Sequence, residues 1–197
     1  KNRLWDLFKI ADFRINMDVQ KTSIVDCWLI KPQVFKDDRG YFYESFQKER
    51  FEALTQLAFN PVQDNEAFST YGVVRGLHLQ EAPHAQAKLV RALQGTILDV
   101  AVDLRKESPT FGAVVTAVLS QENKEQLFVP KGCAHGYAVL SPEVVVFYKT
   151  DAYYHPEAES GILYKDAELN IDWRIPQTDQ ILSDKDRLWP TFKTYTQ

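Results

Sequence analysis

Arginine and histidine stand close together in one apolar stretch, Tyr71–Leu79, which reads YGVVRGLHL. Imidazole exchanges protons near neutral pH, and a buried guanidinium needs a partner or an anion because leaving it unpaired costs free energy. Strict strand alternation puts Arg75 and His78 on opposite faces, whereas a bulge at Gly76 would turn both toward one cavity. The stretch therefore predicts either a structural histidine or a polar cavity that holds both groups.

Three other segments carry groups that could act on a ligand. His135 lies between alanine and glycine, which lets a ligand approach closely, although a capping histidine in a tight turn explains it equally well. Tyr148 lies near the end of the apolar run 144–150, where a tyrosine is usually a core residue with its hydroxyl at the edge. The run 183–186, SDKD, is most simply a solvated loop.

The spacing of the histidines does not favour a metal centre. Neither HxH nor HExxH occurs, and the nearest pair, His78 and His84, is separated by Pro83 and an expected loop. We therefore expect a site that works without a metal and without another cofactor.

The composition narrows the class of protein. The chain has 197 residues, 45% hydrophobic and 25% charged, which suits one globular domain. Its formal net charge of −4 argues against nucleic acid as a main partner. No apolar run approaches the roughly 18 residues of a membrane span, so no membrane partner is expected. Two cysteines, Cys27 and Cys133, cannot form a disulfide framework, and a cytoplasmic location is the simplest expectation.

Short apolar runs separated by turn residues predict a mainly β protein. Turn signals every 8 to 12 residues or so are typical of a β-sandwich or barrel, and the lack of βαβ alternation disfavours a Rossmann fold. The helical spacing of apolar residues predicts one helix at Glu49–Leu57. Strands are expected at 23–30, 41–46, 73–80, 88–93, 96–104, 114–119, 126–129, 134–140 and 144–150.

The strand expected at Thr96–Leu104 is apolar on one face and carries two aspartates on the other. Asp99 and Asp103 share that second face with Ile97 and Ala101 by the period of two. The strand could line a polar cavity, but from this strand alone the favoured interpretation is that both aspartates face water.

The two ends of the chain carry weaker patterns. Residues 1–16 lack the features of a signal peptide, and Met17 is the only methionine. We interpret residues 1–16 as an N-terminal extension or a vector remnant and expect a single domain over residues 17–197. The polar stretch Pro156–Gln197 predicts irregular chain with a short helix packed on the sandwich.

Eight segments, taken together and in order, resemble the dTDP-4-dehydrorhamnose 3,5-epimerase family. They are FKDDRGYFYESF (35–46), VQDN (62–65), VVRGLHLQ (73–80), AQAKLVRALQG (85–95), DVAVDLRKESPTFG (99–112), QENKEQLFVPKGCAHGY (121–137), YKTDAYYHPEAESGI (148–162) and LSDKD (182–186). The resemblance covers nearly all of residues 17–190. It implies a cupin-like jelly-roll β-sandwich with a few short helices, a homodimer, and catalysis without a metal.

The reaction implied by the resemblance is epimerisation at C3 and C5 of a 4-keto-6-deoxyhexose carried on dTDP. Both carbons adjoin the C4 ketone, so a base can remove each α-proton and an acid can return one to the opposite face. His78 matches the base and Asp186 its carboxylate partner. Tyr148 matches the acid, and Lys88 matches a cation near the C4 oxygen that stabilises the enolate.

Further positions match substrate-binding residues of the family. Among them, Arg39, Arg75 and Lys185 suit the diphosphate, and Tyr153 would stack on thymine. In the family, Arg39 and Glu44 tend to reach into the site of the partner subunit. The matching positions are Arg39, Glu44, Gln63, Asp64, Asn65, Arg75, His135, Tyr153, Glu159 and Lys185.

Some features depart from the family pattern and leave alternatives open. Cys133 stands where phenylalanine is usual, EAFS follows VQDN, and Glu66 adds a negative charge near the expected anion site. One alternative is an epimerase that inverts only C3 or only C5. Another is a metal-dependent cupin enzyme, and a third is a sugar-nucleotide-binding module without catalysis. The retained acid and base argue against the third, because binding alone needs neither.

Overall fold

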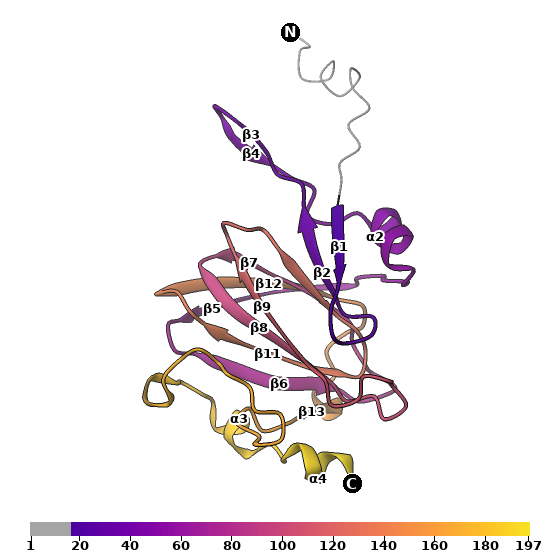
Figure 1. Ribbon diagram of the computed structural model, residues 1–197, viewed down its shortest axis with the longest axis vertical. Coiled ribbons are helices and arrows are strands. Elements are labelled where there is room, and N and C mark those ends of the chain that lie inside the picture. Colours follow the sequence, from indigo (N-terminus) through magenta and orange to yellow (C-terminus); the bar gives the residue numbers. More distant parts are fainter. Residues whose placement is uncertain (1–16) are drawn as a thin grey trace.

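The computed structural model describes residues 17–197, so the expectation for residues 1–16 lies outside it. Two antiparallel sheets pack face to face (Figure 1). In spatial order, one sheet consists of β1 (Met17–Lys21), β2 (Trp28–Pro32), β10 (Gln126–Val129), β7 (Lys88–Gln94), β12 (Glu143–Thr150) and β5 (Gln63–Thr70). The other consists of β13 (Glu159–Gly161), β6 (Val74–Gln80), β11 (Cys133–Val139), β8 (Thr96–Asp103) and β9 (Val114–Ser120). This confirms the predicted β-sandwich.

The remaining elements lie around the two sheets. Strands β3 (Phe35–Asp37) and β4 (Gly40–Phe42) form a separate hairpin that projects away from the sandwich (Figure 1). The helices are α2 (Lys48–Thr55), α3 (Asp184–Leu188) and α4 (Phe192–Thr196), with 3-10 turns at Pro156–Ala158 and Gln177–Asp179. Over residues 17–197, no helix combines the length and the apolar character needed to cross a bilayer.

The strand boundaries differ from the sequence expectations where side chains bond the local backbone. The strand expected at 23–30 begins at Trp28, because the Thr22 hydroxyl donates to the carbonyls of Ile24 and Cys27 and stabilises a turn there. The strand expected at 41–46 ends at Phe42. The strands β1, β3, β5 and β13 were not predicted, because β1 and β5 are largely polar and β3 and β13 have only three residues each.

Three apolar clusters hold the layers together. The first lies between the sheets and includes Val90 and Val146 from one sheet with Ile97 and Val139 from the other. The second covers the outer face of the five-stranded sheet, where Leu77 and Val100 pack against Trp173 and other residues of the C-terminal segment. In the third, Phe51 of α2 packs with Phe59 and Phe128 on the outer face of the six-stranded sheet. The C-terminal segment is therefore a structural layer, and it includes α3 and α4.

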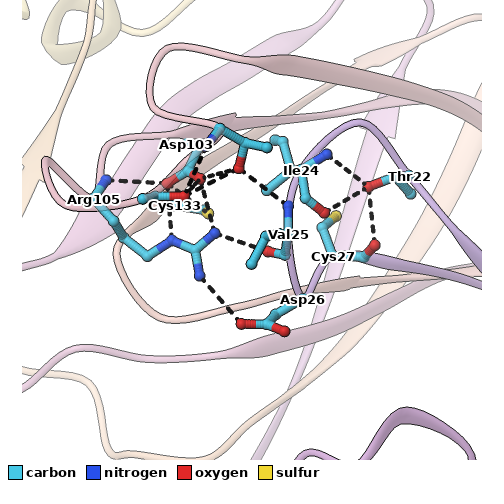
Figure 2. A network of polar contacts seen from close by, with 10 residues as sticks. Thr22, Ile24, Val25, Asp26, Cys27, Asp103, Arg105 and Cys133 are labelled. Carbon is cyan, nitrogen blue, oxygen red and sulfur yellow. Dashed lines mark hydrogen bonds and ion pairs between the residues drawn. The ribbon is translucent and has the colours of Figure 1, made fainter.

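Both aspartates of β8 point into the sandwich, so the expectation that they face water was wrong. Asp99 and Asp103 have no exposed surface and share the strand face of Ile97 and Ala101. Asp103 accepts a hydrogen bond from the Arg105 guanidinium at 2.8 Å (Figure 2). It also accepts hydrogen bonds from the hydroxyls of Ser108 and Thr110. Although burial disfavours the charged form, these hydrogen bonds hold the pKa of Asp103 below its usual value. The partners lie on the following loop, where strand alternation alone could not place them.

Candidate active site

A cavity of about 290 Å³ lies between the sheets, at the end where their inner faces turn from apolar to polar. His78 of β6 and Glu159 of β13 come from one sheet, whereas Lys88 of β7 and Tyr148 of β12 come from the other. The same strands thus supply the apolar core at one end and polar groups at the other. The lining residues are Gln63, Asn65, His78, Leu79, Gln80, Gln86, Lys88, Tyr148, Tyr154 and Glu159.

A bulge in β6 aims His78 into this cavity. The pairing of β6 with β11 changes register between His135↔His78 and Tyr137↔Arg75, so β6 holds one extra residue there. Val74 and Leu77 consequently both face the outer cluster, and the residues that follow them, Arg75 and His78, both face inward.

The extra residue of the bulge is Gly76, whose conformation and surroundings both exclude a side chain. Its φ of +117° is one that L side chains rarely adopt. A Cβ there would lie 2.6 Å from the Gly136 Cα of β11. The bulge that the sequence left as an alternative is therefore present, and two facing glycines accommodate it.

Asp186 of α3 holds the imidazole of His78 from outside the sheet. His78 Nε2 and Asp186 Oδ1 form a hydrogen bond, and the carboxylate is almost completely buried. The Ser183 side chain caps α3 by accepting from the backbone N–H of Asp186. Burial opposes the charge on Asp186, but its hydrogen bonds to the His78 ring and from Ser183 lower its pKa below the usual value. This pair can orient the imidazole and stabilise its protonated form.

Trp189 fixes the same imidazole from a second direction. Its ring meets the His78 ring edge to face, with centroids 6.0 Å apart. Both Asp186 and Trp189 belong to the C-terminal segment, which therefore restrains two sides of the His78 ring.

Tyr148 and Lys88 lie on the opposite wall of the cavity, on adjacent strands. Burial raises the pKa of the Tyr148 hydroxyl, which therefore stays protonated at neutral pH. Burial lowers the pKa of Lys88 to about 8, while Asp99 and Glu159 partly offset that effect. A lysine with this pKa remains mainly cationic at pH 7, yet it holds its proton less strongly than an exposed lysine does.

His135 lies behind the cavity rather than on its lining. Its Nε2 lies 2.7 Å from Asp99 Oδ1, and both side chains are buried. Burial raises the pKa of Asp99, although the nearby His135 and Lys88 act against this rise. The Asp99 carboxyl group lies near Lys88, and its hydrogen bond to His135 fixes its position, so His135 is positioned to support this wall of the cavity.

Glu159 and two partners form one rim of the cavity. Lys185 Nζ lies 2.7 Å from Glu159 Oε1, and the Tyr154 hydroxyl donates to Glu159 Oε2 at 3.0 Å. Burial acts against the charge on Glu159, but these two hydrogen bonds lower its pKa below the usual value. Tyr154 lines the cavity whereas the predicted Tyr153 is 64% exposed, and two adjacent tyrosines in sequence gave no basis for choosing between them.

Several residues expected at the site lie away from the cavity of this chain. Asp64 is on the outer face of β5, where Lys149 donates to both of its carboxylate oxygens. Glu66 follows on the same outer face, so its charge does not enter the cavity. Arg39 and Glu44 belong to the projecting arm, residues 35–46, where they pair with Asp37 and Arg50.

Other expected residues lie close to the cavity. Arg75 donates to the Ser69 hydroxyl at 3.1 Å and keeps part of its guanidinium exposed. Gln63 donates to Asn65 at 2.9 Å, so two neighbouring inward positions of β5 form one polar surface. Gln80 and Gln86 also line the cavity but were not predicted as site residues, although the polar character of that hairpin was visible in the sequence.

Known proteins resemble this chain in sequence and in fold. The family model for dTDP-4-dehydrorhamnose 3,5-epimerase matches residues 21–194. The chain is 51% identical over 170 residues to dTDP-4-dehydrorhamnose 3,5-epimerase of Shigella flexneri, covering 86% of this chain and 93% of that protein. It is also similar to the crystal structure of the enzyme of that name from Elizabethkingia anophelis NUHP1, with a TM-score of 0.89, 51% identity, and coverage of 92% and 99%.

A solved complex extends the comparison to a bound ligand. The epimerase from Legionella pneumophila Philadelphia 1, in complex with dTDP-4-keto-L-rhamnose, has a TM-score of 0.86 and 46% identity, covering 90% of this chain and 94% of that one. The residues matched by the family model, 21–194, include every residue that lines the cavity. On the sequence, the fold and the family model together, the chain belongs to the dTDP-4-dehydrorhamnose 3,5-epimerase family.

Proposed function

We propose that the protein converts dTDP-4-dehydro-6-deoxy-D-glucose into dTDP-4-dehydro-L-rhamnose by inverting C3 and C5. One observation carries the chemical argument: His78 and Tyr148 line one cavity from two different sheets of the sandwich. A ketosugar between them presents one face of its ring to an imidazole and the other to a phenol. Epimerisation needs this opposition, because a single group that removes and returns a proton on one face restores the starting configuration.

His78 acts as the base in this mechanism. Its Nε2 is bonded to Asp186, so the opposite nitrogen is the one available to a substrate proton. When the imidazole accepts a proton from C3 or C5, the buried carboxylate stabilises the resulting charge. The substrate C–H bond breaks, its electron pair moves toward C4, and the C4 oxygen becomes an enolate.

Lys88 and Tyr148 complete the cycle from the other wall. The Lys88 ammonium stabilises the negative charge on the C4 oxygen, and a partly desolvated cation does this more strongly than one in water. The Tyr148 hydroxyl, whose raised pKa keeps it protonated, then gives a proton to the carbon from the opposite face. The exposed cations Arg75 and Lys185 lie at the edges of the site and suit the diphosphate.

Proton exchange tests this assignment directly. The protein is incubated in D2O with dTDP-4-dehydro-6-deoxy-D-glucose, and the H3 and H5 signals are followed by NMR. We expect both signals to disappear and His78→Ala to abolish the exchange. Loss of only one signal would instead support the alternative epimerase that inverts a single carbon.

The acid is tested by Tyr148→Phe, with Tyr71→Phe as a matched control at an exposed tyrosine outside the cavity. We expect Tyr148→Phe to retain proton exchange but to lose inversion at C5, and the control to behave as wild type. Formation of the full product by Tyr148→Phe at the wild-type rate would refute the acid role.

We also propose that the active form is a homodimer and that it works in the cytoplasm. The outer face of β5, β12 and β7 carries Phe68, which is 57% exposed, together with Leu93 and Phe147. Arg91 donates to the Tyr43 hydroxyl at 2.6 Å and ties the arm to the edge of this apolar face. A second copy of the chain would cover the face and bring the arm near the second cavity. Both cysteines are free thiols, as a reducing compartment would keep them.

Mixing two inactive variants tests whether the arm serves the neighbouring site. Arg39→Ala and His78→Ala chains are unfolded, combined and refolded. If Arg39 acts across the interface, a mixed dimer contains one site with both residues intact, so activity returns. If Arg39 serves its own chain, each site of the mixed dimer keeps one defect and the mixture stays inactive.

A further inference from the structure

Two histidines and a glutamate gather on the loops beside the cavity, outside the group assigned to catalysis. The rings of His84 and His155 stack with centroids 3.7 Å apart and an angle of 26°. His155 Nδ1 lies 3.0 Å from Glu157 Oε1, and one ligand atom from each of the three residues lies within 4.8 Å of the others. Within residues 17–197, no other trio of histidine, cysteine or carboxylate side chains meets this criterion.

One buried side chain positions both histidines. Gln80 Nε2 donates to the backbone carbonyl of His84 at 2.6 Å, and the backbone N–H of His155 donates to Gln80 Oε1 at 2.7 Å. The backbone N–H of Glu81 also donates to Ala158 O at 2.9 Å, which joins the two loops a second time. The histidine backbones are therefore held in place, and most of the entropic cost of bringing the ligands together has been met by folding.

We propose that His84, His155 and Glu157 form a binding site for a divalent transition metal of the zinc type. Two imidazole nitrogens and one carboxylate are ligands that Zn²⁺ commonly takes, and a water molecule would complete a tetrahedron. Tetrahedral bonds of about 2.05 Å place two ligand atoms about 3.3 Å apart. The three groups need to contract by only about 1.5 Å from their present spread of up to 4.8 Å.

Rotation of one ring supplies that contraction. The lone pairs of nearly parallel rings do not converge, so one imidazole has to turn out of the stack about its Cβ–Cγ bond. The His155 side chain is 38% exposed and the Glu157 side chain 69% exposed, so both have room to move. Glu157 can follow because its side chain is mostly exposed and its hydrogen bonds go to the neighbouring His155 and to its own backbone.

The site would link metal binding to the substrate cavity through Gln80. The side chain of Gln80 lines the cavity and also accepts from His155, and it donates to the carbonyl of Tyr153 at 3.2 Å. A metal that joins the two loops would restrain the segment that carries Tyr153 and Tyr154. The metal would cross-link the two loops at the cavity rim and would take no part in proton transfer.

Binding is measured on the full chain with any purification tag removed and after treatment with EDTA. Isothermal titration with Zn²⁺ should give one site per chain, and Mg²⁺, which prefers oxygen ligands, should give none under the same conditions. Removing a ligand should weaken binding at least tenfold, since even the loss of an outer hydrogen-bond partner commonly costs 10–100-fold. The variants are His155→Gln and Glu157→Gln, with Glu107→Gln as the control at an exposed glutamate elsewhere.

The outcomes separate this proposal from the proposed function, because the titration contains no substrate. One-to-one binding that both ligand variants weaken and Glu107→Gln leaves unchanged supports the site. Absence of saturable binding by the wild-type chain, or equal binding by Glu157→Gln, overturns it. Because Glu157 is exposed, we expect Glu157→Gln to keep the fold. Circular dichroism checks that His155→Gln is also folded.

Discussion

Replacing Lys88 with methionine should make the unliganded protein more stable while it removes catalysis. The ammonium of Lys88 lies in the cavity between the two sheets, close to the buried pair Asp99 and His135. Methionine has a similar length and shape but no charge, so the substitution keeps the packing and removes the desolvated cation. Lys88 would then be a residue that stabilises the enolate but lowers the stability of the folded protein.

The size of that cost follows from the pKa of Lys88. Its fall from 10.5 to about 8 corresponds to about 3.5 kcal/mol, at about 1.4 kcal/mol for each pKa unit. Partial exposure reduces this figure, because the side chain is open to the cavity and solvent there screens its charge. We expect Lys88→Met to raise the free energy of unfolding by roughly 1–2 kcal/mol at pH 7.

The gain should depend on pH in a defined direction. Between about pH 8 and pH 10.5, the unfolded chain binds the Lys88 proton while the folded chain releases it. Wild-type stability therefore rises with pH across this window relative to the variant. The advantage of Lys88→Met should be complete below pH 8 and should shrink as the pH rises toward 10.5.

Urea unfolding at pH 7.0 and pH 9.5 measures the change, and the D2O experiment measures proton exchange. Lys106→Met at an exposed lysine serves as the control, and it should alter stability by no more than about 0.5 kcal/mol at either pH. A Lys88→Met protein that is less stable than wild type at pH 7, or that exchanges H3 and H5 at the wild-type rate, would refute the reasoning.

Three further substitutions test separate parts of the structure. Asp186→Asn keeps a hydrogen bond to His78 but removes the charge, so kcat should fall by about 10²–10⁴ with little change in KM; a kcat within twofold of wild type would contradict the pairing. Gly161→Ala places a Cβ 2.7 Å from the Trp189 ring and 2.5 Å from Leu77 O, and urea titration should show a loss of about 1–3 kcal/mol. An unchanged urea midpoint would show that the C-terminal segment moves to accommodate the new Cβ without loss of stability. Asp103→Asn should cost about 2–3 kcal/mol at pH 7, because Arg105 loses the closer and more buried of its two charged partners, Asp103 and Asp26. The folded-state pKa of Asp103 is lowered, so its contribution to the free energy of unfolding is complete above the ordinary value of 3.8 and is lost progressively below it. The difference in stability between wild type and Asp103→Asn should therefore narrow at pH 3. A wider difference at pH 3 would contradict this assignment.

The sequence predicted the central strands well because their apolar residues pack on both sides. Strands such as β8 and β11 lie between two apolar clusters, so nearly every position is buried and most of their residues are apolar. β5 could not be found in this way. Its inward positions include Gln63 and Asn65, which line the cavity, and its outward positions include two acidic residues. The strand lacked an apolar signal because it serves the site.

The site itself could not be assembled from spacing. His78, Lys88 and Tyr148 come from three strands of two sheets, and no local pattern shows which inner faces will meet. The resemblance to a known family supplied these residues, and their roles stay predictions until tested. It did not indicate that Asp64 would face outward or that Tyr154, rather than Tyr153, would line the cavity.

The distance along the chain between His78 and Asp186 has a consequence for biosynthesis. The two residues are 108 positions apart, and every strand of both sheets is synthesised before Asp186. A nascent chain can thus pair its strands while the imidazole still lacks its carboxylate. Proton abstraction would begin only when the late segment docks, so a chain that ends before residue 186 would lack a competent base.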